Sequence, residues 1–404
     1  MTDLSFPSSL EDLTPQIVTA LLSEPHPDAV VTEVRVLKSA SRGDGAASTA
    51  DRVLLELEYQ SDVGLPSRMV LKTVLLHRGL RFGPQAIEAT GRVLRVLGAL
   101  PFGSIFRRSL FSVIGAYQRR YPHAPDAMYV NEVRFYRSIR PQLSIEAPAC
   151  FGSVFDEAHR SFGVLMEDLT LRGARFPNAM TEVTLEEMQG LVRTLAALHA
   201  RYWESPSLQT ELRWLATPVS GGMAPVFRAM GLDLIRNQVE TNAYKAALIE
   251  PLGRTVDQLW QALWKAQDIL CCGPQTLLHG DPHIANTYLL PGAPGGFLDW
   301  QLMVKGRWAH DFTYLTITGL SPEQRRRHER DLLALYLDEL GRLGVPNAPS
   351  ADDAWLRYRQ AAIWGLVIGW LITPTENYGE AITAANLDRL VTAVQDLETL
   401  RALD

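Results

Sequence analysis

The sequence predicts an α+β fold whose two halves differ in kind. In the first half, apolar and polar side chains alternate over residues 52–59, and a turn containing Gly and Pro leads to a second apolar run at 68–74. This pattern is typical of a β-hairpin. In the second half, apolar residues recur at helical spacing over 185–198. All nine tryptophans lie at or after Trp203. We therefore expect a β-rich part followed by a helical part.

Composition narrows the class of protein. The 404 residues are 47% hydrophobic and 21% charged, which is typical of a globular chain and excludes a disordered or fibrous one. A net charge of −6 argues against a nucleic-acid partner. Three cysteines with no CxxC pair indicate neither a disulfide framework nor structural zinc, so a cytoplasmic location is expected. The longest apolar run, 361–373, is too short to span a bilayer.

The remaining elements follow from local patterns. After the hairpin, the first half predicts a helix over 131–140 and a short strand in the segment GVLMEDL at 163–169. A capping box, Thr184 with Glu187, begins the helix from 185. Apolar periodicity predicts further helices at 244–270, 322–343, 352–372 and 384–402, and a hairpin of strands 287–290 and 296–299 joined by Pro-Gly-Ala-Pro-Gly.

One basic segment stands apart from the rest of the chain. Residues 77–120 hold eight arginines, no lysine and a single acid, Glu88, so their net charge is +7 and the remainder is −13. Apolar residues interleave with these arginines, which favours an amphipathic helical insert docked on the acidic remainder. A lid over an anionic or lipophilic substrate and peripheral contact with a membrane stay open as alternatives.

Three oxygen-bearing side chains surround the predicted second hairpin. Asp281 and Asn286 precede its first strand, and Asp299 ends its second. Because the outer ends of a hairpin meet, these three side chains should converge. Carboxylate and amide oxygens suit a hard cation such as Mg²⁺. Two of them could hold the metal while the third accepts a proton from an attacking hydroxyl.

The same stretch admits a second interpretation. His279, Asp281 and His283 form HxDxH, which could ligate a transition metal in a hydrolase. Such sites need further ligands, and only His310 lies nearby in the sequence. We therefore favour magnesium, with His279 as an organiser of the loop.

The segment HGDPHIAN at 279–286, followed by Asp299-Trp300, resembles the catalytic region of the aminoglycoside phosphotransferase and choline kinase superfamily. Within it, the chain is most similar to the ecdysteroid-kinase-like (CHK kinase-like) branch. The resemblance implies a bilobal protein-kinase-like fold that transfers the γ-phosphoryl group of ATP to a small-molecule hydroxyl with Mg²⁺. Residues 1–169 would form the nucleotide-binding lobe, with the insert at 77–125, and 170–404 the helical lobe with the catalytic loop and the substrate site.

The resemblance also implies roles for single residues. Asp281 would be the catalytic base, and Asn286 and Asp299 the Mg²⁺ ligands. Asp311, in the element that follows, would brace the catalytic loop together with His279.

Lys72 belongs to a predicted strand with Val70 and Val74 on its face, and a lysine in that position needs an anion. Nucleotide phosphates or a structural carboxylate would serve. The resemblance makes Lys72 the phosphate-binding lysine, paired with Glu132. Upstream, small residues would form a loop that covers the nucleotide: Gly43, Gly45, Ser48 and Thr49.

The segment at 163–169 resembles the hinge of the family. Met166 would be the gatekeeper, and the Glu167 carbonyl and the Leu169 amide would meet the adenine edge. These are mainly backbone roles, which side chains do not reveal.

The acceptor is expected to lie against aromatic helices in the second half. The residues concerned are Trp355, Trp364, Trp370 and Tyr378. Their apolar character favours an uncharged lipophilic alcohol, such as a steroid or terpenoid. A nucleotide-binding pseudokinase is the alternative from another functional class.

Overall fold

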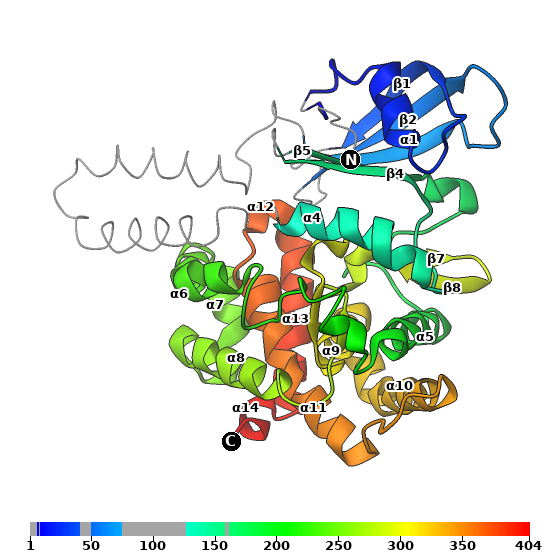
Figure 1. Ribbon diagram of the computed structural model, residues 1–404. Coiled ribbons are helices and arrows are strands. Elements are labelled where there is room, and N and C mark those ends of the chain that lie inside the picture. The colour runs from blue at the N-terminus through cyan, green and yellow to red at the C-terminus, as the bar shows by residue number, and fades with distance from the viewer. Residues whose placement is uncertain (1–5, 8, 41–49, 75–126, 158–160) are drawn as a thin grey trace. The chain divides into compact units, whose positions relative to one another are not determined.

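The computed structural model describes residues 6–7, 9–40, 50–74, 127–157 and 161–404 (Figure 1). The chain divides into two compact units, one of residues 1–141 with 148–172 and one of 142–147 with 173–404. The predicted glycine loop and the arginine-rich insert at 77–125 lie outside the described residues. The first unit is built on a sheet and the second is largely helical, so the α+β class is confirmed.

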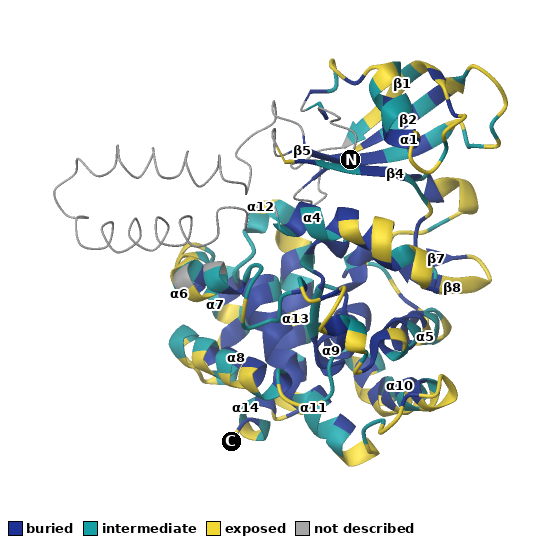
Figure 2. Ribbon diagram, in the orientation of Figure 1, coloured by how far each residue is buried: buried dark blue, intermediate teal, exposed yellow. Residues whose placement is uncertain are grey.

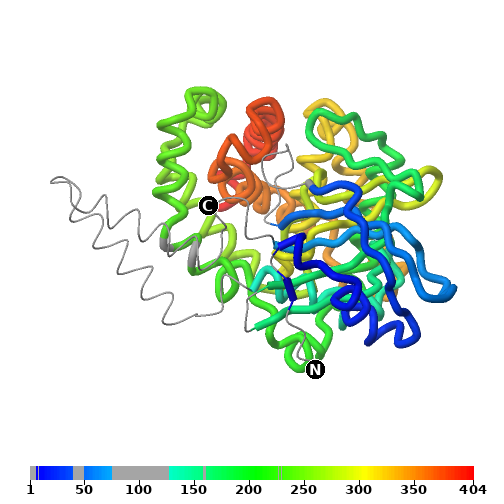
Figure 3. The backbone as a smooth tube through the Cα atoms, turned by 90° about the horizontal axis from the view of Figure 1, so that it is seen from above, coloured from blue at the N-terminus to red at the C-terminus, as the bar shows by residue number. Residues whose placement is uncertain are grey.

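The first unit contains a five-stranded antiparallel sheet, in the order β1-β2-β3-β5-β4. Figure 3 shows the path of the backbone, coloured by residue number. The predicted hairpin is confirmed, because Asp51 pairs with Thr73 at one end of β2–β3 and Glu56 with Arg68 at the other. The strands are β1 Val31–Ala40, β2 Asp51–Tyr59, β3 Arg68–Thr73, β4 Cys150–Asp156 and β5 Ser161–Glu167.

One face of this sheet carries the core of the unit. Side chains alternate along a strand, so Leu55 of β2, Leu71 of β3 and Leu165 of β5 share this face. Helix α1 (Pro15–Leu22) packs on it through Leu21 and other apolar residues. Gly163 provides the space for Phe6, because a Cβ there would lie 2.3 Å from the phenyl ring. The same alternation turns the intervening residues of β3 to the opposite face.

Helix α4 (Ala127–Arg134) belongs to this opposite side and continues as a π-helical turn, Phe135–Ile139. Tyr129 stacks on Phe162 of β5 at 4.6 Å between ring centroids. The predicted helix at 131–140 therefore exists, but it begins earlier and changes its hydrogen-bond pattern halfway.

In the second unit, α5 (Leu185–Tyr202) begins at the predicted capping box. The helix predicted over 244–270 is wrong as a single element, since α7 (Ala243–Ile249) and α8 (Val256–Leu270) are separate. Between them, Pro251 lacks a backbone donor and Gly253 takes a left-handed conformation, φ +56°, which ends the helix. Helix α6 (Ala224–Thr241) precedes α7.

Four helices of this unit, α5, α10, α11 and α13, pack against α9, whose eleven residues are all buried (Figure 2). The helices predicted at 352–372 and 384–402 are each divided, the first by a change to π-helix at Gly365 and the second by Glu398 at φ 48°. The elements are α9 Ala309–Gly319, α10 Pro322–Arg342, α11 Ala351–Trp364, the π-helix η9 Gly365–Leu371, α12 Thr375–Tyr378, α13 Glu380–Asp396 and α14 Thr399–Ala402.

Two small antiparallel pairs flank the predicted catalytic loop. Strand β6 (Thr276–Leu278) pairs with β9 (Val304–Gly306), and β7 (Thr287–Leu290) pairs with β8 (Ala293–Phe297). The second strand of the hairpin was predicted at 296–299, which is wrong at both ends. Gly292, at φ +65°, closes a tighter turn, so β8 starts earlier and ends before Asp299. Within the described ranges, no helix has the length and apolar character needed to span a bilayer.

Candidate active site

The loop at 279–286 joins β6 to β7 and depends on a glycine. Gly280 has φ +86°, and a Cβ at this position would lie 2.0 Å from the carbonyl oxygen of Leu302. Only glycine fits both the left-handed backbone and this close approach. The loop ends in a single 3-10 turn, Ile284–Asn286, which leads directly into β7.

Helix α9 braces this loop through its first turn. The buried carboxylate of Asp311 accepts the backbone N–H groups of His279 (2.6 Å) and Gly280 (3.0 Å), and it lies 3.2 Å from Nε2 of His199. Burial alone would raise the pKa of Asp311, but the contact with His199 and the neighbouring His310 and His279 lower it below its ordinary value. The predicted contact of Asp311 with the loop is therefore present.

His279 uses both ring nitrogens inside the loop. Its Nε2 lies 2.8 Å from the carbonyl oxygen of Leu298, and its Nδ1 accepts the N–H of Asp281 at 3.3 Å. Its ring lies 4.6 Å from that of Trp300. These contacts fix the path of the chain on both sides of Asp281, in agreement with the predicted organising role.

The loop and the end of the hairpin bring the three predicted oxygen donors together. The side-chain amide nitrogen of Asn286 donates to the backbone carbonyl oxygen (2.8 Å) and to Oδ2 (3.2 Å) of Asp281, and the backbone carbonyl oxygen of Asn286 accepts the N–H of Leu298 at 2.7 Å. Asp299 follows at φ 63°. Burial, and next the charge of Asp299, raise the pKa of Asp281 well above its ordinary value. Within the part of the chain that is described, Asn286 Oδ1 accepts no hydrogen bond, so it could ligate a cation.

Aromatic rings surround His283 on the next turn of the loop. Its ring centroid lies 5.9 Å from Tyr314, 5.7 Å from Trp370 and 6.0 Å from Tyr378, each in edge contact. Its Nε2 is 3.5 Å from the Tyr378 hydroxyl and 3.8 Å from Oδ2 of Asp281. Burial lowers the pKa of His283 to about 4, so the ring is neutral at physiological pH.

The four aromatic residues predicted for the acceptor are not all neighbours. Trp364 contacts Tyr314 at 5.1 Å, so it joins the group that includes Trp370 and Tyr378. Trp355 instead lies 5.4 Å from Tyr358, with the Arg330 guanidinium 3.8 Å above its ring. Nine residues of α11 separate Trp355 from Trp364, about two and a half turns, which places the two side chains on opposite faces.

Sequence reasoning missed two contributions of α9. His310 Nε2 lies 3.1 Å from the carbonyl oxygen of Gly280, and burial lowers the pKa of His310. Tyr314 packs beside His283. A signal existed for Tyr314, because it lies three residues after Asp311 and so faces the same side of the helix.

In the first unit, Lys72 forms a buried ion pair. Its Nζ lies 2.8 Å and 2.7 Å from the two carboxylate oxygens of Glu132, and the residues are 3% and 1% exposed. The predicted pairing is confirmed. The register of β3 with β5 sets Lys72 opposite Val164 and Val70 opposite Met166. An apolar surface therefore borders the lysine on its own face of the sheet.

The predicted hinge overlaps the end of β5 and is held by Asp168 together with Arg68 of β3. Met166 and Glu167 end the strand, and Leu169 begins a 3-10 turn, Leu169–Arg172. The buried carboxylate of Asp168 accepts the Thr170 N–H at 3.1 Å and the Arg68 guanidinium at 2.6 Å. The path of the backbone is fixed here, while its predicted contact with adenine stays a prediction.

The geometry does not support the transition-metal alternative. Among the described residues, no group of three or more His, Cys, Asp or Glu side chains could hold a metal ion. His283 and Asp281 of the HxDxH pattern lie close together, but His279 does not complete a ligand set because both of its ring nitrogens already bond the backbone.

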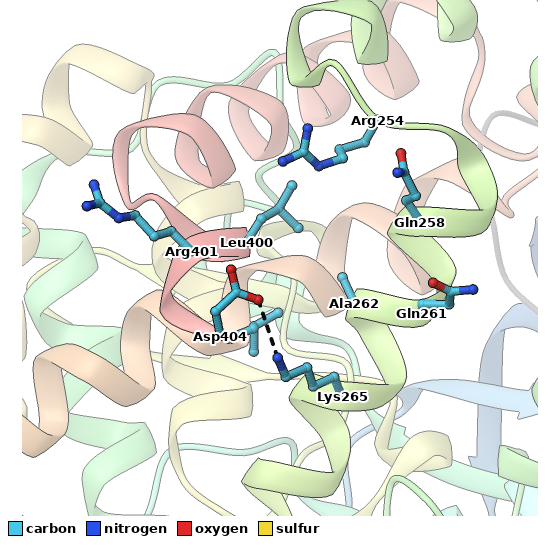
Figure 4. A pocket seen from close by; sticks show the side chains of 9 residues that line it. Arg254, Gln258, Gln261, Ala262, Lys265, Leu400, Arg401 and Asp404 are labelled. Atoms are coloured by element: carbon cyan, nitrogen blue, oxygen red, sulfur yellow. Dashed lines mark hydrogen bonds and ion pairs between the residues drawn. The ribbon is translucent and has the colours of Figure 1, made fainter.

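A surface pocket of about 470 Å³ lies between α8 and α14 (Figure 4). Arg254, Lys265 and Arg401 line it, and Lys265 reaches the Asp404 carboxylate at 3.4 Å. None of the predicted site residues belongs to this pocket.

Residues 103–344 match the model of the phosphotransferase enzyme family, APH. This segment is more than half of the chain and includes the loop at 279–286, Asp299 and Asp311. The sequence matches none of the curated proteins with which it was compared.

Several solved structures are similar over most of their length. The alignment with spectinomycin phosphotransferase, solved in complex with ADP and spectinomycin, has 10% identity and a TM-score of 0.47. It covers 96% of this chain and 99% of that chain. The alignment with macrolide 2′-phosphotransferase from Brachybacterium faecium has 15% identity and a TM-score of 0.39, and it covers 91% of this chain and 97% of that chain. The alignment with choline kinase from Streptococcus pneumoniae has 12% identity and a TM-score of 0.41, and it covers 95% of this chain and 98% of that chain. With TM-scores below 0.5, these likenesses identify neither a substrate nor a mechanism.

The family match covers the loop whose geometry is described above, and the fold is of the α+β protein-kinase-like type. The chain belongs to the phosphotransferase enzyme family and is a small-molecule kinase.

Proposed function

We propose that this kinase transfers the γ-phosphoryl group of ATP, with Mg²⁺, to a hydroxyl of a small uncharged lipophilic alcohol such as a steroid or terpenoid. Residues 1–169 would serve as the nucleotide-binding lobe and 170–404 as the catalytic and acceptor-binding lobe. The observation that carries the proposal is the position of Asp281, whose neighbours are a second carboxylate, Asp299, and His283 with its aromatic rings.

Lys72 is the proposed partner of the nucleotide phosphates. The ion pair with Glu132 holds its ammonium group in one place (2.7 Å), so the charge is oriented before the nucleotide binds. Val70, Val164 and Met166 share its face of the sheet and offer an apolar surface to the adenine ring. The Glu167 carbonyl and the Leu169 amide are the proposed partners of the adenine edge.

Asn286 and Asp299 are the proposed ligands of the metal. Asn286 Oδ1 is left for a cation because the amide nitrogen is committed to Asp281. Burial, and next the charge of Asp299, raise the pKa of Asp281, so a divalent cation bound beside these two carboxylates would stabilise their charged forms. A bound Mg²⁺ would neutralise negative charge on the transferred phosphoryl group.

Asp281 is the proposed base. Asn286 orients its carboxylate through Oδ2 (3.2 Å), while Oδ1 accepts no hydrogen bond from the residues described. The side chain is 23% exposed, so an acceptor hydroxyl could reach it. Asp281 would align this hydroxyl and take up its proton during transfer.

Neutral groups on the acceptor side support an uncharged alcohol. His283 is neutral at physiological pH, and Tyr314, Trp370 and Tyr378 surround it. A polycationic acceptor would require carboxylates in this place. This apolar surround, together with the HGDPHIAN and DW segments, supports assignment to the ecdysteroid-kinase-like branch.

The test is turnover of ATP with ecdysone, geraniol, choline and spectinomycin as candidate acceptors, measured as phosphorylated product. We expect transfer to one of the first two alcohols and loss of about 10²- to 10⁴-fold in kcat for Asp281→Asn. The matched control is Asp388→Asn, which changes an exposed aspartate of α13. Full transfer by Asp281→Asn would show that the proposed base is wrong. Transfer only to choline or spectinomycin would overturn the acceptor class, and binding of Mg·ATP without any turnover would favour a pseudokinase.

A further inference from the structure

Lys245 is a fully buried charged residue that the proposed reaction does not use. It belongs to α7 and has 0% exposure. Its Nζ donates to the Gln238 side chain at 3.0 Å and to the carbonyl oxygens of Leu371 at 3.3 Å and Thr373 at 2.5 Å. Lysine is almost never fully buried unless its charge is compensated. The three acceptors compensate the charge of Lys245, and its place in the structure calls for a reason.

The two carbonyl groups lie where the π-helix η9 ends. Carbonyl groups at the end of a helix receive no hydrogen bond from an N–H group of the helix, and a positive charge is favourable beside them. Lys245 therefore caps η9 and continues its hold beyond the last residue of the helix, to Thr373.

Neighbouring residues hold the same segment. The Tyr244 hydroxyl lies 2.6 Å from Thr375 Oγ1, which in turn donates to Asn242 Oδ1 at 3.1 Å. Three side chains within four consecutive positions thus bind residues 371–375. We name Asn242, Tyr244 and Lys245 the α7 clamp.

Both ends of the clamped segment carry aromatic side chains that contact His283. Trp370 precedes the segment and lies 5.7 Å from the imidazole ring. Tyr378 follows it, with its hydroxyl 3.5 Å from His283 Nε2. His283 in turn lies 3.8 Å from the carboxylate of Asp281. A shift of residues 371–375 would therefore move the rings that border the proposed base.

We propose that Lys245 is a positioning residue, which sets the acceptor-binding surface of the kinase by fixing residues 371–375 between Trp370 and Tyr378. This inference rests on the proposed function. Packing alone does not call for a lysine here, since an apolar side chain would fill the space without burying a charge. Burial lowers the pKa of Lys245 to about 8, opposed by the charge of Glu376, which reflects the cost of keeping the ammonium group in this place.

The test compares Lys245→Met with Lys305→Met. Lys305 also donates to a backbone carbonyl, that of Leu208 at 3.1 Å, and among the described residues it forms no hydrogen bond or ion pair with the clamped segment. With geraniol or ecdysone as acceptor, Lys245→Met should raise the KM for the alcohol at least fivefold and change the KM for Mg·ATP less than twofold. Lys305→Met should change neither constant. A purely structural role for Lys245 would affect both constants alike or only the melting temperature, which would overturn the inference.

Amide hydrogen exchange gives a readout that needs no acceptor. For Lys245→Met we expect exchange to rise at least tenfold in residues 371–378 and to rise also in 279–286, with no change in 322–342. If exchange in 279–286 equals that of the wild type, the inference is wrong. Tyr244→Phe removes only a hydroxyl and should cause smaller changes in the same segments, so the inference can be tested even if Lys245→Met does not fold. Absence of wild-type turnover would count against the proposed function, while the exchange data would still decide on the clamp.

Discussion

The buried ion pair of Lys72 and Glu132 allows stability and function to be separated by mutation. The two groups are 3% and 1% exposed and meet through both carboxylate oxygens. Removing one partner of such a pair is strongly destabilising and costs about 3–5 kcal/mol. We therefore expect Glu132→Leu to lower the free energy of unfolding by about 3 kcal/mol or more, which is a fall of about 10²-fold in the folding equilibrium constant.

The double variant Lys72→Met/Glu132→Leu removes both charges. Replacement of a buried ion pair by apolar residues of similar volume is often neutral or stabilising, so the double variant should recover most of the lost stability. It should not recover catalysis, because the proposed phosphate-binding charge is gone.

The assay is urea unfolding followed by far-ultraviolet circular dichroism, together with the dissociation constant for Mg·ATP. The matched control is Arg35→Leu, because Arg35 forms ion pairs in the same sheet but on the exposed surface, where solvent screens the charges and a much smaller loss of stability is expected. The reasoning is refuted if Glu132→Leu costs less than 1 kcal/mol, or if the double variant is as unstable as the single one. Mg·ATP binding by the double variant with wild-type affinity would refute the role of Lys72.

Five further variants, two of them controls, test the loop and the helices around it. Asp311→Asn should cost about 2–3 kcal/mol, since the amide cannot accept both backbone N–H groups. Because the folded pKa of Asp311 is lowered, its contribution is present above pH 3.8 and lost as the pH falls through the folded value, so the variant should flatten this acid dependence of unfolding. Gly280→Ala should lower the melting temperature and abolish transfer, because the new Cβ would meet a carbonyl oxygen at 2.0 Å. Gly292→Ala, with the same left-handed backbone but nothing within 4 Å, should cost only about 1–2 kcal/mol and keep activity. Gly369→Ala should destabilise the second unit, because its Cβ would lie 2.3 Å from the hydroxyl of Tyr314. Gly341→Ala lies in open space on α10 and should stabilise the second unit by about 0.5–1 kcal/mol. Thermal unfolding of the two variants gives the comparison.

Features encoded by neighbouring residues could be predicted from the sequence. The β2–β3 hairpin follows from alternation over a few residues, the strand at the hinge follows from a short apolar run, and the capping box marks the start of α5 correctly. The convergence of Asp281 and Asn286 with the end of the hairpin was also predictable, because hairpin closure is a local property.

Features that depend on distant partners were missed. Strands β1 and β4 form the edges of the sheet and pair with residues that local patterns do not identify. Trp355 was grouped with Trp364 by proximity in the sequence, although the helical period places them on opposite faces. Lys245 caps carbonyl groups that lie more than 120 positions away in the sequence, so no local sequence pattern could have revealed this contact.

The tryptophans make the second unit optically distinct from the first. All nine lie within residues 203–370, so intrinsic fluorescence excited at the indole band reports on the second unit alone. Two of them are in ring contact with histidines of the catalytic loop, Trp300 with His279 and Trp370 with His283. An imidazolium quenches indole emission more strongly than neutral imidazole, so protonation of the loop or movement of its rings should change the emission without any attached label.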